Sequence, residues 1–264
     1  MSTQCNARKW RRFMPWLAAT LVMVGVLALT GPIPGAGAAA NLNPGVIPPQ
    51  ARAHGMSYGE WVGAWWKWAA AIPAGQNPIL DTTGEFGSIG QSGPVWFLAG
   101  SFGGTVSRQL VIPPGKTLFF PVFNSLWWAP DDLDDATWLA EDILGLDASQ
   151  MTEEELISLI ANYQVDFATL MEVTVDGVPV QGLSRYRAES QPQDLTDTDL
   201  LDTIGAEVSH PNAAIGAGYW LMLAPLPPGK HTVRIAVESQ NPVFGDFSLD
   251  VSYELTVKPL GKAK

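Results

Sequence analysis

The chain has 264 residues, with 15 Lys or Arg residues against 26 Asp or Glu residues, a formal net charge of −11 at pH 7, and one cysteine. An acidic protein repels nucleic acid and anionic lipid, so we expect no nucleic-acid partner. Because Cys5 is the only cysteine, the chain can form neither an internal disulfide nor a site with several cysteine ligands. A chain of this length can bury a full hydrophobic core without such links.

The first 40 residues follow the pattern of a secretory signal peptide. Four basic residues between Arg8 and Arg12 precede an apolar run from Leu17 to Leu29, and the small residues 35–40 fit a cleavage site. The apolar run is short for a membrane span, which needs roughly 20 residues, although an uncleaved anchor is the alternative. We expect cleavage, an extracellular or periplasmic location, and no stable membrane span afterwards. The mature chain would carry 11 basic and 26 acidic residues, a net charge of −15.

Residues 41–264 contain no long low-complexity linker, which predicts a single domain. Its first helix is expected near residues 57–72, because Ser57 and Glu60 have the spacing of a capping box and Pro73 would end the helix. One face of this helix is apolar and is expected to lie in the core; it consists of Tyr58, Trp61, Trp65, Trp68 and Ile72.

A loop and a series of strands follow. Glycines recur at every third position from Gly84 to Gly93, which predicts an ordered loop of turns and matches neither a dinucleotide nor a phosphate motif. The tetrapeptide Pro-Pro-Gly-Lys occurs at 113–116 and again at 227–230, between strand-like segments, and predicts type II turns. Residues 172–180 predict a hairpin around Asp176 and Gly177.

Two further helices are expected near residues 131–144 and 152–171. The second has a capping-box spacing at Thr152 and Glu155 and a buried stripe that extends to Leu170. Residues 231–237 and 247–257 alternate apolar and polar side chains, as half-buried strands do. Together these elements predict an α+β fold, an antiparallel β-sandwich of immunoglobulin-like or jelly-roll-like type with packed helices.

Several motifs together resemble a family of exported bacterial proteins of unassigned function. They are Tyr58-Gly-Glu-Trp with Trp65-Trp66-Lys-Trp68, residues 90–100, residues 114–124, and the segment Gly218-Tyr-Trp-Leu-Met-Leu that continues through Pro-Pro-Gly-Lys-His-Thr-Val233 as a hairpin. The resemblance runs through most of the mature chain and implies export but no particular chemistry.

Five residues are candidates for ligand binding. Trp66 projects away from the apolar stripe of its helix, and Trp127 and Trp128 could lie in a loop at a strand end; an exposed indole can stack on a sugar ring. Asn124 precedes this Trp pair. Arg108 opens a strand beside the glycine loop, where it could bind carboxylates or backbone carbonyls.

Two acidic clusters are candidates for calcium, the one cofactor that the sequence admits. The first comprises Asp131, Asp132, Asp134 and Asp135, and the second spans Asp194–Asp202. Neither matches an EF-hand loop, and the first also suits a helix N-terminus. We prefer a solvated acidic surface to a metal site.

The favoured function is a secreted, non-catalytic binding or envelope-associated protein whose partner is a glycan or another envelope component, bound through exposed Trp. The alternative is an exported hydrolase that uses carboxylates near the Trp helix and the glycine loop, among them Glu60, Asp81 and Glu85. A purely structural envelope protein is a third hypothesis. A pocket with two carboxylates and an exposed Trp would favour the enzyme.

Overall fold

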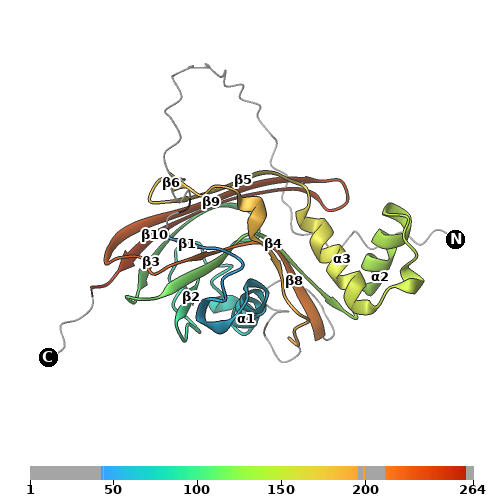
Figure 1. Cartoon of the computed structure of the whole chain (residues 1–264), viewed down its shortest axis with the longest axis horizontal. Coiled ribbons are helices and arrows are strands. Elements are labelled where there is room, and N and C mark those ends of the chain that lie inside the picture. Colours follow the sequence, from blue (N-terminus) through green and yellow to red (C-terminus); the bar gives the residue numbers. More distant parts are fainter. Residues whose placement is uncertain (1–42, 44, 196–198, 200–211, 260–264) are drawn as a thin grey trace, which may run out of the picture. The chain divides into compact units, whose positions relative to one another are not determined.

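The computed structural model describes residues 43, 45–195, 199 and 212–259, and the chain from Asn43 onward clusters as one compact unit. The predicted signal peptide and part of the second acidic cluster lie outside the described residues. The described part of the chain is a mixed α+β structure, mostly strands in two sheets with three α-helices (Figure 1). The helices are α1 (Tyr58–Ala70), α2 (Leu133–Trp138) and α3 (Glu153–Val165).

The first sheet has the strand order β1-β8-β4-β2, with β7 also paired to β8. Its strands are β1 (Val46–Ile47), β2 (Val95–Phe97), β4 (Thr117–Ala129), β7 (Arg187–Glu189) and β8 (Asn212–Leu223). Almost every residue of β4 and β8 is buried, which shows that both faces of this sheet are covered.

The second sheet has the order β3-β10-β9-β5-β6. Its strands are β3 (Gly104–Ile112), β5 (Ala168–Val175), β6 (Val178–Pro179), β9 (Gly229–Asn241) and β10 (Gly245–Val257). Along β3, β9 and β10 buried and more accessible residues alternate, so only one face of this sheet lies in the core. The other face is accessible to solvent.

Strand pairing differs from the expected purely antiparallel arrangement. Most pairs are antiparallel, but β3 runs parallel to β10 and β2 runs parallel to β4. The reason lies in the two Pro-Pro-Gly-Lys segments. Each joins a strand of one sheet to a strand of the other, β3 to β4 and β8 to β9. The expected hairpin through residues 218–233 is therefore wrong, and this segment is a corner between sheets.

Helix α1 covers one face of the first sheet, and its sequence explains why. The capping box is present, since the Ser57 side chain accepts from the Glu60 backbone and the Glu60 side chain accepts from the Ser57 backbone. Trp65 contacts Trp220 of β8 edge to face, with ring centroids 5.3 Å apart. The predicted core stripe is confirmed, because all its residues are buried; they are Tyr58, Trp61, Trp65, Trp68 and Ile72.

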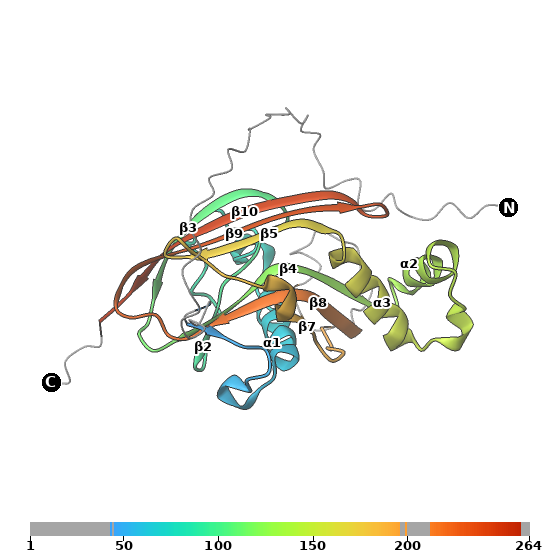
Figure 2. The ribbon, with the colours of Figure 1, turned by 45° about the horizontal axis from the view of Figure 1, so that its top comes forward.

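The opposite face of the first sheet packs against the second sheet and against α3 (Figure 2). Phe123 of β4 stacks on Phe247 of β10, with ring centroids 5.5 Å apart. Further along β4, the Ser125 hydroxyl donates to the Ala161 carbonyl of α3 at 2.7 Å. The first sheet is thus the middle layer between α1 on one side and the second sheet with α3 on the other.

The other two helices are shorter than expected. Helix α2 covers Leu133–Trp138 and continues as a π-helical turn over Leu139–Ile143. Helix α3 begins with the predicted capping box but ends at Val165, because residues from Ala168 onward form β5 and pair with β9. The ladder with β9 thus takes the last four residues, 168–171, of the expected helix. The predicted hairpin at Asp176 and Gly177 is confirmed as β5–β6.

Candidate functional site

The structure places the Trp candidates for ligand binding inside the protein. Trp66 is 7% exposed and fits beside Gly216, where an added Cβ would lie 2.3 Å from its ring. Trp127 is 1% exposed and its indole N–H donates to the Gln164 side chain at 2.7 Å, and Trp128 is also buried. A sugar could therefore stack on these indoles only after the segments covering them had moved.

Arg108 is a buried cation that holds two loops together. Its guanidinium donates to the Tyr253 hydroxyl at 2.6 Å and lies over the Tyr253 ring, 5.5 Å from the centroid. The guanidinium nitrogens also donate to the backbone carbonyls of Ile79, Asp81, Ala99 and Gly100 at 2.6–3.2 Å, with Nη1 shared among Tyr253, Ala99 and Gly100. The structure shows the expected contact of Arg108 with backbone carbonyls.

The other candidate, Asn124, is half-buried on β4 opposite Gly218.

The first acidic cluster lies at the start of α2. Asp132 accepts from the Trp128 backbone N–H at 2.9 Å, while Asp134 and Asp135 occupy the first helical turn, where the helix dipole favours negative charge. The fourth member, Asp131, is half-buried just before the helix. Among the described residues, no group of three or more His, Cys, Asp or Glu side chains is arranged to hold a metal ion. Calcium binding remains a hypothesis without structural support.

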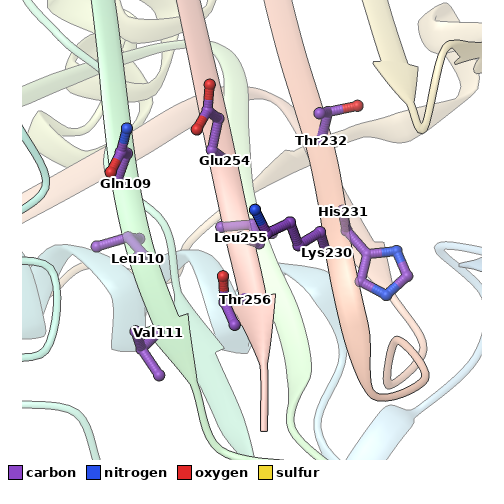
Figure 3. Close-up of a pocket in the computed structure, with 9 residues that line it drawn as sticks. All are labelled: Gln109, Leu110, Val111, Lys230, His231, Thr232, Glu254, Leu255 and Thr256. Atoms are coloured by element: carbon purple, nitrogen blue, oxygen red, sulfur yellow. The ribbon is translucent and has the colours of Figure 1, made fainter.

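The outer face of the second sheet carries a shallow hollow with a volume of about 420 Å³. Three polar side chains form a row across it, because the register aligns Gln109 of β3 with Glu254 of β10, and Glu254 with Thr232 of β9 (Figure 3). All three are exposed. Neighbouring strands lie about 4.8 Å apart, so an amide, a carboxylate and a hydroxyl follow one another at that spacing.

A second row lies two residues further along the strands. The register aligns Val111 with Thr256, and Thr256 with Lys230. Val111 is 51% exposed, which confirms that this row faces away from the core. In Figure 3 the Lys230 side chain extends toward β10. The hollow therefore offers an apolar contact, a hydroxyl and an ammonium group beside the first polar row.

His231 borders this hollow but belongs to the inner side of β9. Its ring lies on the side of the strand away from β10 (Figure 3). The Nδ1 atom is 2.7 Å from the Asp176 carboxylate, and the Nε2 atom is 2.8 Å from the Pro227 carbonyl. Burial lowers the pKa of His231, but the hydrogen bonds with Asp176 and Pro227 and the charge of Asp176 outweigh it, so the pKa is raised.

The second hollow, about 340 Å³, lies at the start of α1 and brings together two carboxylates, Glu60 and Glu189. Glu189 accepts from the Ser158 hydroxyl at 2.9 Å and also from the Asn162 side chain. Hydrogen bonds from the Ser57 backbone and hydroxyl, together with the charge of Arg52 at 3.1 Å, outweigh desolvation and lower the pKa of Glu60. Both carboxylates are thus engaged in contacts that hold the fold together.

The sequence identifies Glu60 as a candidate but none of the residues that line the hollow on the second sheet. The alternation along β9 and β10 shows that Thr232 and Glu254 point outward. No pattern in the sequence predicts that β3 would pair in parallel with β10 and bring Gln109 to the same row. Likewise, Glu189 lies on a three-residue strand that carries too few residues for a periodic signal.

No family model, curated protein or solved structure matches this chain. Within the ranges that the structure describes, no helix is long and apolar enough to cross a membrane.

Proposed function

We propose that this chain is an exported, non-catalytic protein that binds a neutral glycan on the outer face of the second sheet. The observation that carries the proposal is the aligned row of Gln109, Glu254 and Thr232, three exposed hydrogen-bonding side chains on adjacent strands. The row supports a binding surface on the sheet instead of on the buried Trp residues.

The chemistry of the row suits sugar hydroxyls. The amide of Gln109 and the hydroxyl of Thr232 both donate and accept, whereas the carboxylate of Glu254 only accepts. A polyol can therefore find complementary partners at each strand, and Val111 provides an apolar contact for the C–H groups of a ring. The acidic charge of the chain disfavours anionic polysaccharides, which is why we propose a neutral glycan.

The alternative is a hydrolase centred on Glu60 and Glu189, and their meeting in the second hollow is the observation that favours it. Acid–base hydrolysis needs one carboxylic acid that holds a proton near neutral pH. The lowered pKa of Glu60 makes it a poor proton donor. Glu189 is tied to Ser158 and Asn162 of α3, so we rank catalysis below binding.

For the fold, we propose that the two sheets form a β-sandwich. The shared core and the stacking of Phe123 on Phe247 support this. The choice between an immunoglobulin-like and a jelly-roll-like arrangement stays a prediction, and the two parallel strand pairs are departures from either antiparallel pattern. Export and the resemblance to an exported bacterial family likewise stay proposals that rest on the sequence.

The test is a glycan array with neutral and acidic oligosaccharides, followed by affinity measurements on three variants. Thr232→Ala removes one hydrogen-bonding hydroxyl, and Glu254→Gln replaces a charged acceptor by a neutral amide oxygen, so each should weaken binding by roughly tenfold. Glu238→Gln is the matched control, because Glu238 is exposed on β9 outside the hollow. Unchanged affinity in both site variants, or no binding to any neutral glycan, would refute the proposal.

A further inference from the structure

His231 is held between two hydrogen-bond acceptors. Its Nδ1 atom lies 2.7 Å from an Asp176 carboxylate oxygen, and its Nε2 atom lies 2.8 Å from the Pro227 carbonyl oxygen. A carbonyl oxygen and an ionised carboxylate can only accept. Both ring nitrogens must therefore carry protons for both contacts to be hydrogen bonds, which means that this arrangement requires the imidazolium form.

The same carboxylate is connected to the proposed glycan site. The other oxygen of Asp176 accepts from the Thr232 backbone N–H at 2.8 Å, and the Asp176 backbone N–H donates to the Thr232 carbonyl at 2.8 Å. Thr232 is one end of the polar row, and Lys230 of the second row lies between Pro227 and His231 along the chain. The His231 ring thus ties the β5–β6 turn and the corner at Pro227 to the strand that carries the site.

The geometry of the β5–β6 turn fixes the position of Asp176, one of the two partners of His231. Asp176 and Gly177 both have positive φ, 51° and 76°, as a type I′ turn requires, so the carboxylate is presented by a rigid two-residue loop. The Pro227 carbonyl belongs to the corner between β8 and β9. Loss of the Nε2 proton would place a ring lone pair against the lone pairs of this carbonyl, so the corner would be the part that yields.

The charged groups around the ring favour the proton. Asp176 on the β5–β6 turn is the direct partner, whereas Glu254 on β10 and Lys230 on β9, the other charged residues that line the hollow, lie on the side of β9 away from the ring (Figure 3). The pKa of Asp176 is lowered, since its hydrogen bonds with His231 and Thr232 outweigh the effect of desolvation, so it stays ionised. The raised pKa of His231 agrees with this balance.

We propose that protonation of His231 is a pH switch that locks Lys230 and Thr232 in place and thereby strengthens ligand binding at the hollow in mildly acidic surroundings. This proposal rests on the proposed glycan-binding function. As the pH rises through the folded-state pKa, the Pro227 contact is lost first, the corner loosens, and the affinity of the site falls.

The switch itself is tested without a ligand. The histidine ring signals of the protein are followed by NMR over pH, together with amide hydrogen exchange. The switch predicts a titration of His231 above its ordinary pKa, and protection of the Thr232 amide that falls by roughly tenfold between about pH 5.5 and about pH 8.5 after correction for the intrinsic rate. His231→Gln and Asp176→Asn should remove the pH dependence of protection.

His54→Asn is the matched control, because His54 contacts Thr117 elsewhere in the fold and its positive φ of 55° suits asparagine. This control should keep the pH dependence of the Thr232 amide. A protection that does not change with pH in the wild-type protein, or that changes equally in His231→Gln, would overturn the switch.

The connection to binding is measured separately with cellohexaose and with the N-acetylglucosamine hexamer as probes. Wild-type affinity should fall several-fold between about pH 5.5 and about pH 8.5, while that of His231→Gln should not change. Equal pH dependence in both proteins would overturn regulation by His231 while leaving the glycan site intact. Absence of binding to either probe at both pH values would count against the proposed function and the regulation of binding, whereas the exchange data would still decide whether the switch exists.

Discussion

Arg108 provides the sharpest test of how the core holds the loops around it. Arg108 is 2% exposed and forms no salt bridge within the described residues, so its charge is balanced by oxygen dipoles and by the face of the Tyr253 ring. The change Arg108→Met keeps an unbranched apolar stem of similar width and removes every donor. It removes the Arg108 donor from the carbonyls of Ile79, Asp81 and Gly100 and from the Tyr253 hydroxyl, whereas the Ala99 carbonyl keeps the Tyr253 hydroxyl as its donor.

The magnitude follows from the number of acceptors that lose a partner. A buried group left unsatisfied costs about 1–3 kcal/mol, but such losses are not additive, and water can reach the loop carbonyls once they relax. We therefore expect Arg108→Met to lower the free energy of unfolding by about 4 kcal/mol. Arg108→Lys retains the charge but cannot reproduce the planar fork of the guanidinium. Its free energy of unfolding should therefore lie between those of wild type and Arg108→Met, about 2 kcal/mol below wild type.

The assay is urea unfolding followed by tryptophan fluorescence, with the denaturant slope checked so that the two variants can be compared. In a domain of this size, 1 kcal/mol corresponds to a melting shift of about 2–4 °C, so Arg108→Met should melt roughly 8–16 °C lower. A loss below about 1 kcal/mol for Arg108→Met would show that the loops do not depend on this side chain.

Four further outcomes follow from the structure. Trp65→Ala should lower the free energy of unfolding, measured by calorimetry, by about 3–5 kcal/mol. Because Trp66 is also buried, Trp66→Ala should lower it by a comparable amount instead of by the small amount expected at a surface position. Gly216→Ala should lose about 1–3 kcal/mol in urea unfolding, since the new methyl group would meet the Trp66 ring, and a neutral result would show that α1 can shift. Because the pKa of His231 is raised in the folded state, the stabilisation by its protonated form is complete below pH 6.5 and is lost as the pH rises through the folded-state pKa. The difference in free energy of unfolding between wild type and His231→Gln should therefore shrink over that rise. A difference that stays constant with pH would contradict this. Millimolar calcium should raise the melting temperature no more than magnesium does at equal ionic strength, whereas a calcium-specific rise abolished by Asp134→Asn would establish a metal site.

The sequence predicted best the features that depend on neighbouring residues. The capping boxes at Ser57 and Thr152 and the turn at Asp176 need only a few adjacent positions, and all three are present. The core stripe of α1 is equally local, because the spacing of its aromatic residues fixes one helical face.

The features that depend on distant residues could not be predicted. A Pro-Pro-Gly-Lys segment specifies a change of chain direction but not whether the two strands that it joins pair with each other. The sequence therefore predicts a hairpin at 227–230, whereas β8 and β9 lie in different sheets. The interior position of Trp66 depends on Gly216, 150 residues away along the chain, whose missing side chain makes room for the ring. The candidate site has the same origin, since its polar row exists only through the register of β3, β10 and β9.

The most direct test of the proposed glycan site is a chemical-shift titration of the isotope-labelled protein with the neutral oligosaccharide that binds best on the array. Binding at the outer sheet face predicts the largest shifts at Gln109, Thr232 and Glu254 on three adjacent strands. Shifts centred instead on Glu60 and Glu189, or no shifts with any neutral oligosaccharide, would contradict it.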